Sequence, residues 1–597
     1  MILIVVITGL NLAGPATAQD AAGGRLDLAQ QSSYVTADGS MSLVLDWAGP
    51  PDPALEFVVT IHGRLTNESD VDGPPGDVLN RTEPVRLIDL PRNEVGQLVA
   101  EIPIRSFTPG NEGENRVYIK DAGVYPITAE VRGPEGPVSS LVTHLIRLPT
   151  ETAEAGLLPI SLVLVVSSAD GLTLPEAVTL LAKHPKVALT TLLDSGILTQ
   201  LNGDPELADQ FRQALDGRPV LAMPRLDLDP SALAEIDQGQ LYQSNIEQTR
   251  RDLDALGLST PLDVLPVDGP LTIEGARLLL DLGIELVLDV GSAPRAEGFL
   301  EVDGSTLRVL QIDEQLRDRS PSETGAIIRA HQLLARLAIR FETDRSRVVL
   351  GGAGSANASV AGLDVVLSGI DQLGLLEAVT LTAQVAESFP IRPSERSAQD
   401  LRSVADDIAA ATSALSTYRS FFVAGGLSPT TLHDDLLASL SRDLNPDNRR
   451  RAIESVADAT SDALDVIELP ENQSVTLAAQ TSPIPITIDN RSAGTRTIML
   501  RFASDKLDVV GSDQPFDVAP GTSSIDIQVV ARSVGLSPLD VIVLTPDGSH
   551  ELARTRFQVR STAVPGRGML LSSTGLALLL GWWANSIRKT RRVEPRG

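Results

Sequence analysis

Residues 157–393 alternate short apolar runs with longer amphipathic segments, and this rhythm restricts the possible folds more than any other feature of the chain. Segments such as 324–341 (TGAIIRAHQLLARLAIRF) carry apolar residues at helical spacing. The candidate strands are 158–166, 187–194, 219–227, 262–268, 284–290, 306–313, 347–353 and 376–384. About eight strands separated by helices predict a TIM-like (β/α) barrel rather than an open sheet.

The regions on both sides of this segment have a different pattern. Residues 25–150 and 466–560 contain short runs of alternating hydrophobicity, punctuated by Pro, Gly, Asn and Asp, which predict two β-sandwiches, the first Ig-like. Residues 394–465 read as helices that extend the barrel. The predicted fold class is therefore multidomain, α/β plus all-β.

The two ends of the chain predict export and a membrane anchor. Residues 1–18 form an apolar stretch that ends in Ala16-Thr17-Ala18, a signal-peptidase pattern; the missing basic residues leave an uncleaved anchor or a late start codon as alternatives. Residues 568–587 carry no charge and predict a transmembrane helix, followed by a basic tail at 588–597. We thus expect a single-pass protein of the cell membrane, with its N-terminal ectodomain outside and its C-terminus cytoplasmic.

Composition excludes several classes of function. The chain has no cysteine, which rules out disulfides, thiolate metal sites and cysteine nucleophiles. Its formal charge of -29 would repel phosphate groups, so nucleic-acid binding is excluded. An acidic surface also serves solubility alone, and it identifies no partner.

Aspartates end nearly every candidate strand of the barrel, where barrel enzymes place catalytic groups. They are Asp170, Asp194, Asp227, Asp229, Asp268, Asp289 and Asp313. Such a ring could hold a hard cation or supply a general acid and base for glycosidic cleavage. The best candidates for catalysis are Asp227, Asp229 and Asp268, because they follow adjacent predicted strands.

The same aspartates also fit a purely structural role, which we consider the commoner one. Asp229 precedes Pro230, the pattern of an N-cap followed by proline at the first helical position. Asp268 begins an Asp-Gly-Pro turn, and Thr173 and Glu176 fit a capping box that would leave Asp170 in the preceding turn.

Other motifs of catalysis are missing or incomplete. The six histidines show no i, i+4 pair, and no G-x-S-x-G elbow occurs. The glycine-rich stretch 351–359 (GGAGSANAS) has Asn357 where a dinucleotide loop needs its last glycine. Trp47 is the only tryptophan outside the predicted membrane segment, so no platform for sugar stacking is evident. We expect neither a cofactor nor a bound metal.

The layout, together with the segments 220–233 (VLAMPRLDLDPSAL) and 485–490 (PITIDN), resembles an actinobacterial single-pass membrane family of unknown function. Genes of that family often lie beside the lipid II flippase MurJ, which implies work in the cell envelope. The barrel is faintly similar to polysaccharide deacetylases, whose metal site needs paired aspartates and two histidines. Here 167–171 (SSADG) lacks the second aspartate and no H-x-x-x-H occurs, so no catalytic residue of that family carries over.

These observations favour a membrane-tethered extracytoplasmic scaffold or binding protein over an enzyme. Its expected partners are envelope proteins or an integral membrane protein, and it would contact the membrane through its C-terminal helix. The rival hypothesis is a carbohydrate-active hydrolase, deacetylase-like or glycosidase-like, that uses the strand-end aspartates. A third is a solute-binding receptor whose pocket is the barrel mouth.

Overall fold

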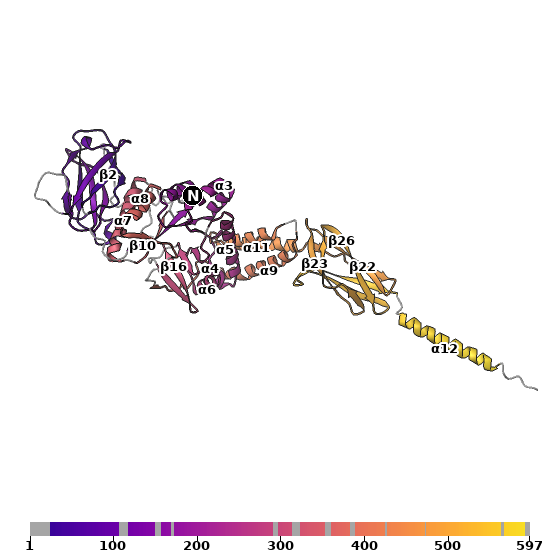
Figure 1. Cartoon of the computed structure of the whole chain (residues 1–597). Coiled ribbons are helices and arrows are strands. Elements are labelled where there is room, and N and C mark those ends of the chain that lie inside the picture. The colour runs from indigo at the N-terminus through magenta and orange to yellow at the C-terminus, as the bar shows by residue number, and fades with distance from the viewer. Residues whose placement is uncertain are drawn as a thin grey trace, which may run out of the picture. The chain divides into compact units, whose positions relative to one another are not determined.

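A computed structural model describes residues 24–590 apart from 37, 107–116, 150–156, 169–171, 259, 291–296, 313–322, 345, 353–359, 383–388, 424–426, 472 and 563–565. The predicted signal peptide at 1–18 lies outside these residues. The chain divides into two compact units (Figure 1). The first comprises Met1–Glu235 and Gly239–Ala398, and the second Ile236–Gln238 and Gln399–Gly597.

The first unit begins with two β-sheets that pack on one apolar core. Alternation along the strands builds this core: β2 buries Met41, Leu43 and Leu45 and turns the residues between them outward. One sheet has the order β1 (Arg25–Gln31), β2 (Ser40–Ala48), β6 (Leu98–Arg105) and β7 (Val117–Tyr118). The other has the order β4 (Val78–Arg81), β3 (Glu56–His62), β8 (Gly123–Gly133) and β9 (Gly136–Arg147), with β5 (Val85–Arg86) beside β3. Two short 3₁₀ helices, η1 (Glu68–Asp70) and η2 (Leu87–Asp89), lie in the connections.

The α/β domain that follows contains two separate sheets. The first has the order β12 (Val220–Ala222), β11 (Thr190–Leu193), β10 (Leu158–Val166) and β17 (Val348–Gly352), with β18 (Leu376–Ala378) also beside β10, and all its pairs are parallel. The second has the order β13 (Val264–Val267), β14 (Leu286–Asp289), β16 (Ser305–Gln311), β15 (Glu297–Val302) and β19 (Phe389–Pro390), with β15 antiparallel to β16.

The expectation of a closed barrel is therefore wrong, because the strands form two separate sheets. Over the described residues, no backbone hydrogen-bond ladder joins β12 to β13 or β16 to β17. Proline explains the first break, because Pro266 inside β13 has no N–H to donate and belongs on a sheet edge. At the second break the Ile312 side chain lies against the backbone of Gly351, where a Cβ would come within 2.6 Å of it.

One apolar interior nevertheless unites the two sheets and makes the domain barrel-like. Val163, Leu221, Val264, Leu288 and Val349 come from five different strands and belong to one buried cluster. The interior is thus packed with side chains and is not a pore. Helices surround the sheets: α1 (Leu174–Lys183), α2 (Ser195–Gly203), α3 (Pro205–Leu215), α4 (Pro230–Glu235), α5 (Gly239–Ala255), α6 (Ile273–Asp281), α7 (Glu323–Thr343) and α8 (Val360–Gln372).

The second unit begins with helices, namely η4 (Arg402–Val404), α9 (Ala405–Phe421), α10 (Pro429–Ser439) and α11 (Pro446–Leu464). Two further sheets follow. One has the order β20 (Ile467–Glu468), β22 (Thr481–Asn490), β26 (Gly521–Ala531) and β24 (Leu507–Val510). The other has the order β21 (Ser474–Leu477), β28 (Glu551–Ser561), β27 (Gly535–Leu544), β23 (Arg496–Ala503) and β25 (Gln514–Val518).

The last helix, α12 (Gly566–Thr590), corrects the prediction of a membrane span at 568–587. Among the described residues, no helix has both the length and the apolar character required to cross a bilayer. Serine, threonine and asparagine at positions such as Ser572, Thr574 and Asn585 lower the mean hydropathy of a segment that we selected for its lack of charge. The expected single-pass location in the cell membrane is wrong for the same reason.

Candidate functional site

The candidate site is the rim formed where the parallel strands of the α/β domain end. We call it the rim, and it comprises Ser167, Ser168, Asp194, Asp227, Asp229, Asp268, Asp289 and Gln311. Asp170 and Asp313, which the sequence also suggested, lie outside the described residues. Barrel enzymes place their catalytic groups at the carboxyl ends of the strands, so any chemistry of a barrel-like domain belongs here.

Asp194 binds the loop that follows β10. Its carboxylate accepts hydrogen bonds from the hydroxyl of Ser167 at 2.7 Å and from the backbone N–H and hydroxyl of Ser168 at 2.7 and 3.1 Å. It also caps α2 by accepting the N–H of Ile197 at 2.7 Å. Burial raises the pKa of Asp194, but these hydrogen bonds outweigh it and hold the pKa below its ordinary value. Asp194 is thus a clamp between β10 and β11 whose charged form the hydrogen bonds favour.

A glycine makes this clamp possible. A Cβ on Gly196 would come within 2.1 Å of the Ser168 hydroxyl oxygen and 2.9 Å of its Cβ. Any larger residue at position 196 would therefore push Ser168 away from Asp194. In the SSADG stretch, which lacks the paired aspartates of a deacetylase metal site, the described residues Ser167 and Ser168 are held by Asp194.

Asp229 is the N-cap of α4, as its position before Pro230 predicted. One carboxylate oxygen accepts the backbone N–H groups of Ser231 at 2.9 Å and Ala232 at 3.2 Å, and the residue is only 3% exposed. These are two of the four N–H groups that a helix leaves without internal partners. One of the three best catalytic candidates from the sequence is thus held by its own helix.

The loops that carry Asp227, Asp229 and Asp268 are neighbours, as expected for residues that follow adjacent strands. The Ser231 hydroxyl accepts the backbone N–H of Thr272 at 3.0 Å, which joins the start of α4 to the loop between β13 and α6. Asp227 is half-buried and Asp268 is exposed. The predicted turn after Asp268 is confirmed, because Gly269 has a positive φ of 99° that favours glycine.

Two residues that the sequence did not suggest position the loop after β12. The side-chain amide of Asn245, on α5, accepts the N–H of Leu226 at 3.1 Å and donates to its carbonyl oxygen at 2.8 Å. The Thr249 hydroxyl, one turn further along α5, accepts the N–H of Arg225 at 2.9 Å. Asn245 and Thr249 are buried polar residues at i, i+4 spacing, and that pattern was a usable signal.

Asp268 and Asp289 lie near each other in register but belong to opposite faces of their sheet. Val267 of β13 pairs with Asp289 of β14, so Asp268 is one step beyond that pair. Leu288 points into the barrel interior, so alternation turns Asp289 outward, where it accepts a hydrogen bond from Gln311 at 3.3 Å. Asp268 continues the phase of Val264, which faces the interior. These two carboxylates therefore do not form an opposed pair.

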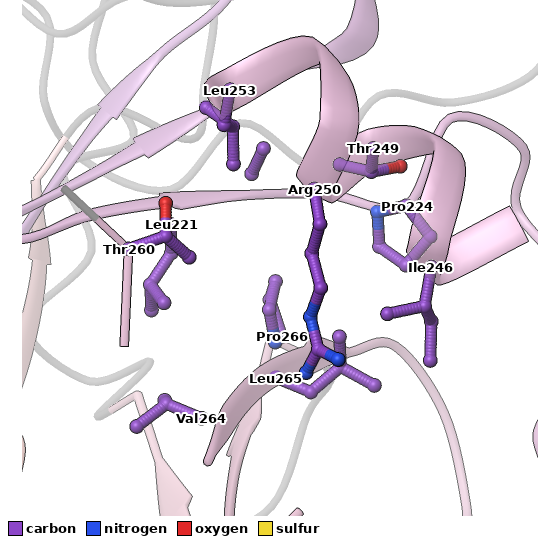
Figure 2. Close-up of a pocket in the computed structure, with 11 residues that line it drawn as sticks. Leu221, Pro224, Ile246, Thr249, Arg250, Leu253, Thr260, Val264, Leu265 and Pro266 are labelled. Atoms are coloured by element: carbon purple, nitrogen blue, oxygen red, sulfur yellow. The ribbon is translucent and has the colours of Figure 1, made fainter. Parts of the chain in front are cut away.

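Within the described residues, no group of three or more histidine, aspartate or glutamate side chains could bind an ion. A small pocket lies between α5 and the ends of β12 and β13, and encloses about 20 Å³, room for about one water molecule. Figure 2 shows the Arg250 side chain extending from α5 toward Leu265 and Pro266. The rim aspartates do not line this pocket.

Comparisons with known proteins do not assign a family. No protein-family model and no curated protein matches the chain. Among solved structures, a 4-alpha-glucanotransferase from Thermococcus litoralis is 8% identical with a TM-score of 0.37, over 65% of this chain and 85% of that one. An alpha-mannosidase from Enterococcus faecalis is 10% identical with a TM-score of 0.32, over 66% of this chain and 61% of that one. An MSP family member from C. elegans is 12% identical with a TM-score of 0.13, over 16% of this chain and 98% of that one. Two of these are carbohydrate-active enzymes by name, but similarities this low assign neither fold nor function.

Proposed function

We propose that this chain is a non-catalytic binding or scaffold protein, and that its barrel-like domain is a structural body between two β-sandwich regions of the sequence. Its partners would be other proteins. The resemblance to an envelope-associated family supports peptidoglycan or envelope assembly as the process it serves.

The observation that carries this proposal is that the Asp229 carboxylate binds N–H groups of its own helix, α4. A general base or nucleophile needs a carboxylate that can reach its substrate. The Asp229 carboxylate is buried and accepts the N–H groups of Ser231 and Ala232, so presenting it to a substrate would break the cap of α4. Asp194 is engaged in the same way by Ser167, Ser168 and Ile197.

A second candidate function is a carbohydrate-active hydrolase that uses Asp227 and Asp268. The hydrogen bond between Ser231 and Thr272, which brings their two loops together, favours it. Glycosidases require two carboxylates on either side of the scissile bond, about 5–10 Å apart depending on the stereochemical outcome. Asp227 and Asp268 are the two residues of the predicted triad that do not cap α4.

The experiment that separates the two functions is a turnover assay with the full-length chain. Reducing ends and acetate released from peptidoglycan and from a panel of acetylated polysaccharides are measured for the wild type and for the double variant Asp227→Asn, Asp268→Asn. The proposal predicts that both proteins release no more product than a boiled sample. Turnover by the wild type that the double variant loses would contradict it and establish the hydrolase.

A further inference from the structure

Helix α7 joins the N-terminal sandwich to the α/β domain inside the first unit. It packs against β1, β8, β9 and η1 of the sandwich, and against α8 of its own domain. Ile327 and Ile328 contact the core of the sandwich, whereas Leu334 and Leu337 belong to the core of the α/β domain. In return, Ile146 of β9 is buried in the α/β core. We call this contact region the junction.

Ion pairs border the junction. Arg340 binds both carboxylate oxygens of Glu68 through Nε at 2.8 Å and Nη2 at 2.7 Å. Arg336 pairs with Asp72, and Arg64 of the sandwich pairs with Glu342 at the end of α7. These pairs are partly exposed, so each contributes modestly on its own. They fix the orientation of the helix on the sandwich.

Two histidines are buried within the junction, one from each domain. His144 of β9 is 2% exposed and His331 of α7 is 1% exposed. In the described part of the chain, both ring nitrogens of His331 lack a hydrogen-bond partner, and so does Nδ1 of His144. Burying an unpaired polar group costs free energy, and burying an unpaired charge costs far more. The junction therefore accommodates both rings only in their neutral form.

The pKa values reflect this environment. Burial lowers the pKa of His144 to about 4; Asp72 and the Val71 backbone oppose the shift, and Arg336 adds to it. Burial also lowers the pKa of His331 to about 4, and the neighbouring His144 adds to the shift. A histidine with a depressed folded-state pKa stabilises its contact fully above its ordinary value of 6.5, and that stability falls as the pH drops from 6.5 toward 4.

Other charged groups around the pair do not offer a partner that would compensate for protonation. On α7, Arg336 and Arg340 are engaged by Asp72 and Glu68. On β1, Arg25 and Asp27 pair with each other, and on α8 Asp364 binds Lys183 and His184. Near Tyr125 of β8, the charged groups are Arg64, Asp121, Arg147 and Glu342. A proton on His144 would be attracted by Asp72, which Arg336 already engages, and repelled by Arg336, and a proton on His331 would be repelled by His144.

We propose that the junction is a pH-dependent contact between domains: protonation of His144 and His331 in a mildly acidic medium releases the N-terminal sandwich from helix α7. Most of each core comes from its own domain; Val71, Val124 and Ile146 of the sandwich lie in the α/β core, and Ile327 and Ile328 of α7 pack on the sandwich core, so these are the apolar residues that release exposes. The change is therefore one of domain orientation. For each histidine, the equilibrium constant for opening rises about 30-fold between about pH 7.5 and about pH 5.

The absence of cysteine allows a clean distance measurement on the full chain. Glu135→Cys places a spin label on the exposed turn between β8 and β9, and Gln213→Cys places another on the exposed face of α3. Pulsed electron resonance then gives the distance distribution between the sandwich and the α/β domain. The proposal predicts one narrow distribution at about pH 7.5 and a broad or shifted one at about pH 5, with proton uptake between the two.

Matched variants identify the residues responsible. His331→Leu keeps the volume and helix preference, removes the buried ring nitrogens, and should reduce the response at about pH 5, because only His144 then remains to be protonated. His144→Gln, a second variant should the first fail to fold, should reduce the response. His62→Gln is the control, because His62 is also buried in the sandwich but both of its nitrogens are hydrogen-bonded, to Gly76 and Thr128. An unchanged wild-type distribution at about pH 5, or an undiminished response in His331→Leu or His144→Gln, would overturn the proposal.

Discussion

The carboxylate of Asp194 accepts a 2.7 Å hydrogen bond from the hydroxyl of Ser167, and this bond ties the ends of β11 and β10 together. Asp194 sits where a barrel enzyme would place a catalytic acid, yet its hydrogen bonds hold the Ser167–Ser168 loop and the start of α2. Its other donors are the backbone of Ser168 and the first turn of α2. The same is true of Asp229 and α4. At the rim, strand-end carboxylates hold loops and helix starts in place.

Replacing Asp194 by alanine should destabilise the α/β domain. The change removes an N-cap and leaves the N–H groups of Ser168 and Ile197 without their acceptor, at a cost of about 1–3 kcal/mol. Hydrogen exchange of peptides that cover β10, β11 and α2 measures it. Asp209→Ala is the control, because Asp209 forms only an exposed pair with Arg212 and its loss should change little. Equal protection in both variants would show that the clamp is unimportant.

Two substitutions of Asp229 distinguish a structural role of its carboxylate from a chemical one. Asparagine caps a helix about as well as aspartate, whereas alanine loses about 1 kcal/mol. We therefore expect Asp229→Asn to keep the hydrogen-exchange protection of α4, and Asp229→Ala to reduce it. If Asp229→Asn abolished biological activity with its stability intact, the carboxylate charge itself would be required and the structural role would be insufficient.

Gly275 allows α6 to approach α4 closely. A Cβ at this position would lie 2.4 Å from the Ser231 hydroxyl oxygen and 2.9 Å from the Ser231 Cα. Gly275→Ala should therefore push the helices apart and cost about 1–3 kcal/mol by overpacking. Gly203→Ala, at the end of α2 where no atom lies within 4 Å, should be neutral or slightly stabilising. Thermal unfolding of both variants tests the contrast, and equal melting temperatures would refute the close contact.

Replacing Arg496 by lysine should lower the stability of the second unit. Its guanidinium lies 5.0 Å from the ring centroid of Phe422 and 5.6 Å from that of Phe421, and the residue is 2% exposed. Lysine keeps the charge but loses the planar group that stacks on the rings, so Arg496→Lys should cost about 1–2 kcal/mol. Hydrogen exchange in α9 and β23 reports the loss. Unchanged protection there would mean that charge alone suffices.

Local structure at the rim could be predicted from the sequence because it depends on neighbouring residues. The capping box was predicted correctly: the Glu176 carboxylate accepts the backbone N–H of Thr173 at 2.9 Å. Asp229 before Pro230 gave the cap of α4, and Gly269 gave the turn after Asp268. In each case a single residue type satisfies a specific backbone group, and the pattern spans at most four positions.

Features that depend on distant residues could not be predicted in the same way. Pro266 explains the break between β12 and β13, because it lies in a strand at the edge of its sheet. Predicting this break requires the strand order, which the sequence does not show directly. The ties from Asn245 and Thr249 to the loop after β12 join residues about twenty positions apart. The prediction of a membrane span at 568–587 was wrong for a different reason. It rested on the lack of charge and did not take into account that the small and polar residues of α12 lower its mean hydropathy.

The central claim, that the rim serves structure and not catalysis, is tested most directly by complementation of a deletion strain. The strain receives the full chain carrying Asp227→Asn and Asp268→Asn, which leaves the Asp229 cap of α4 intact, and its abundance is compared with the wild type by immunoblot. We predict full rescue at normal abundance. Loss of rescue by a protein of normal abundance and unchanged melting temperature would contradict the claim and make these two carboxylates part of a functional site.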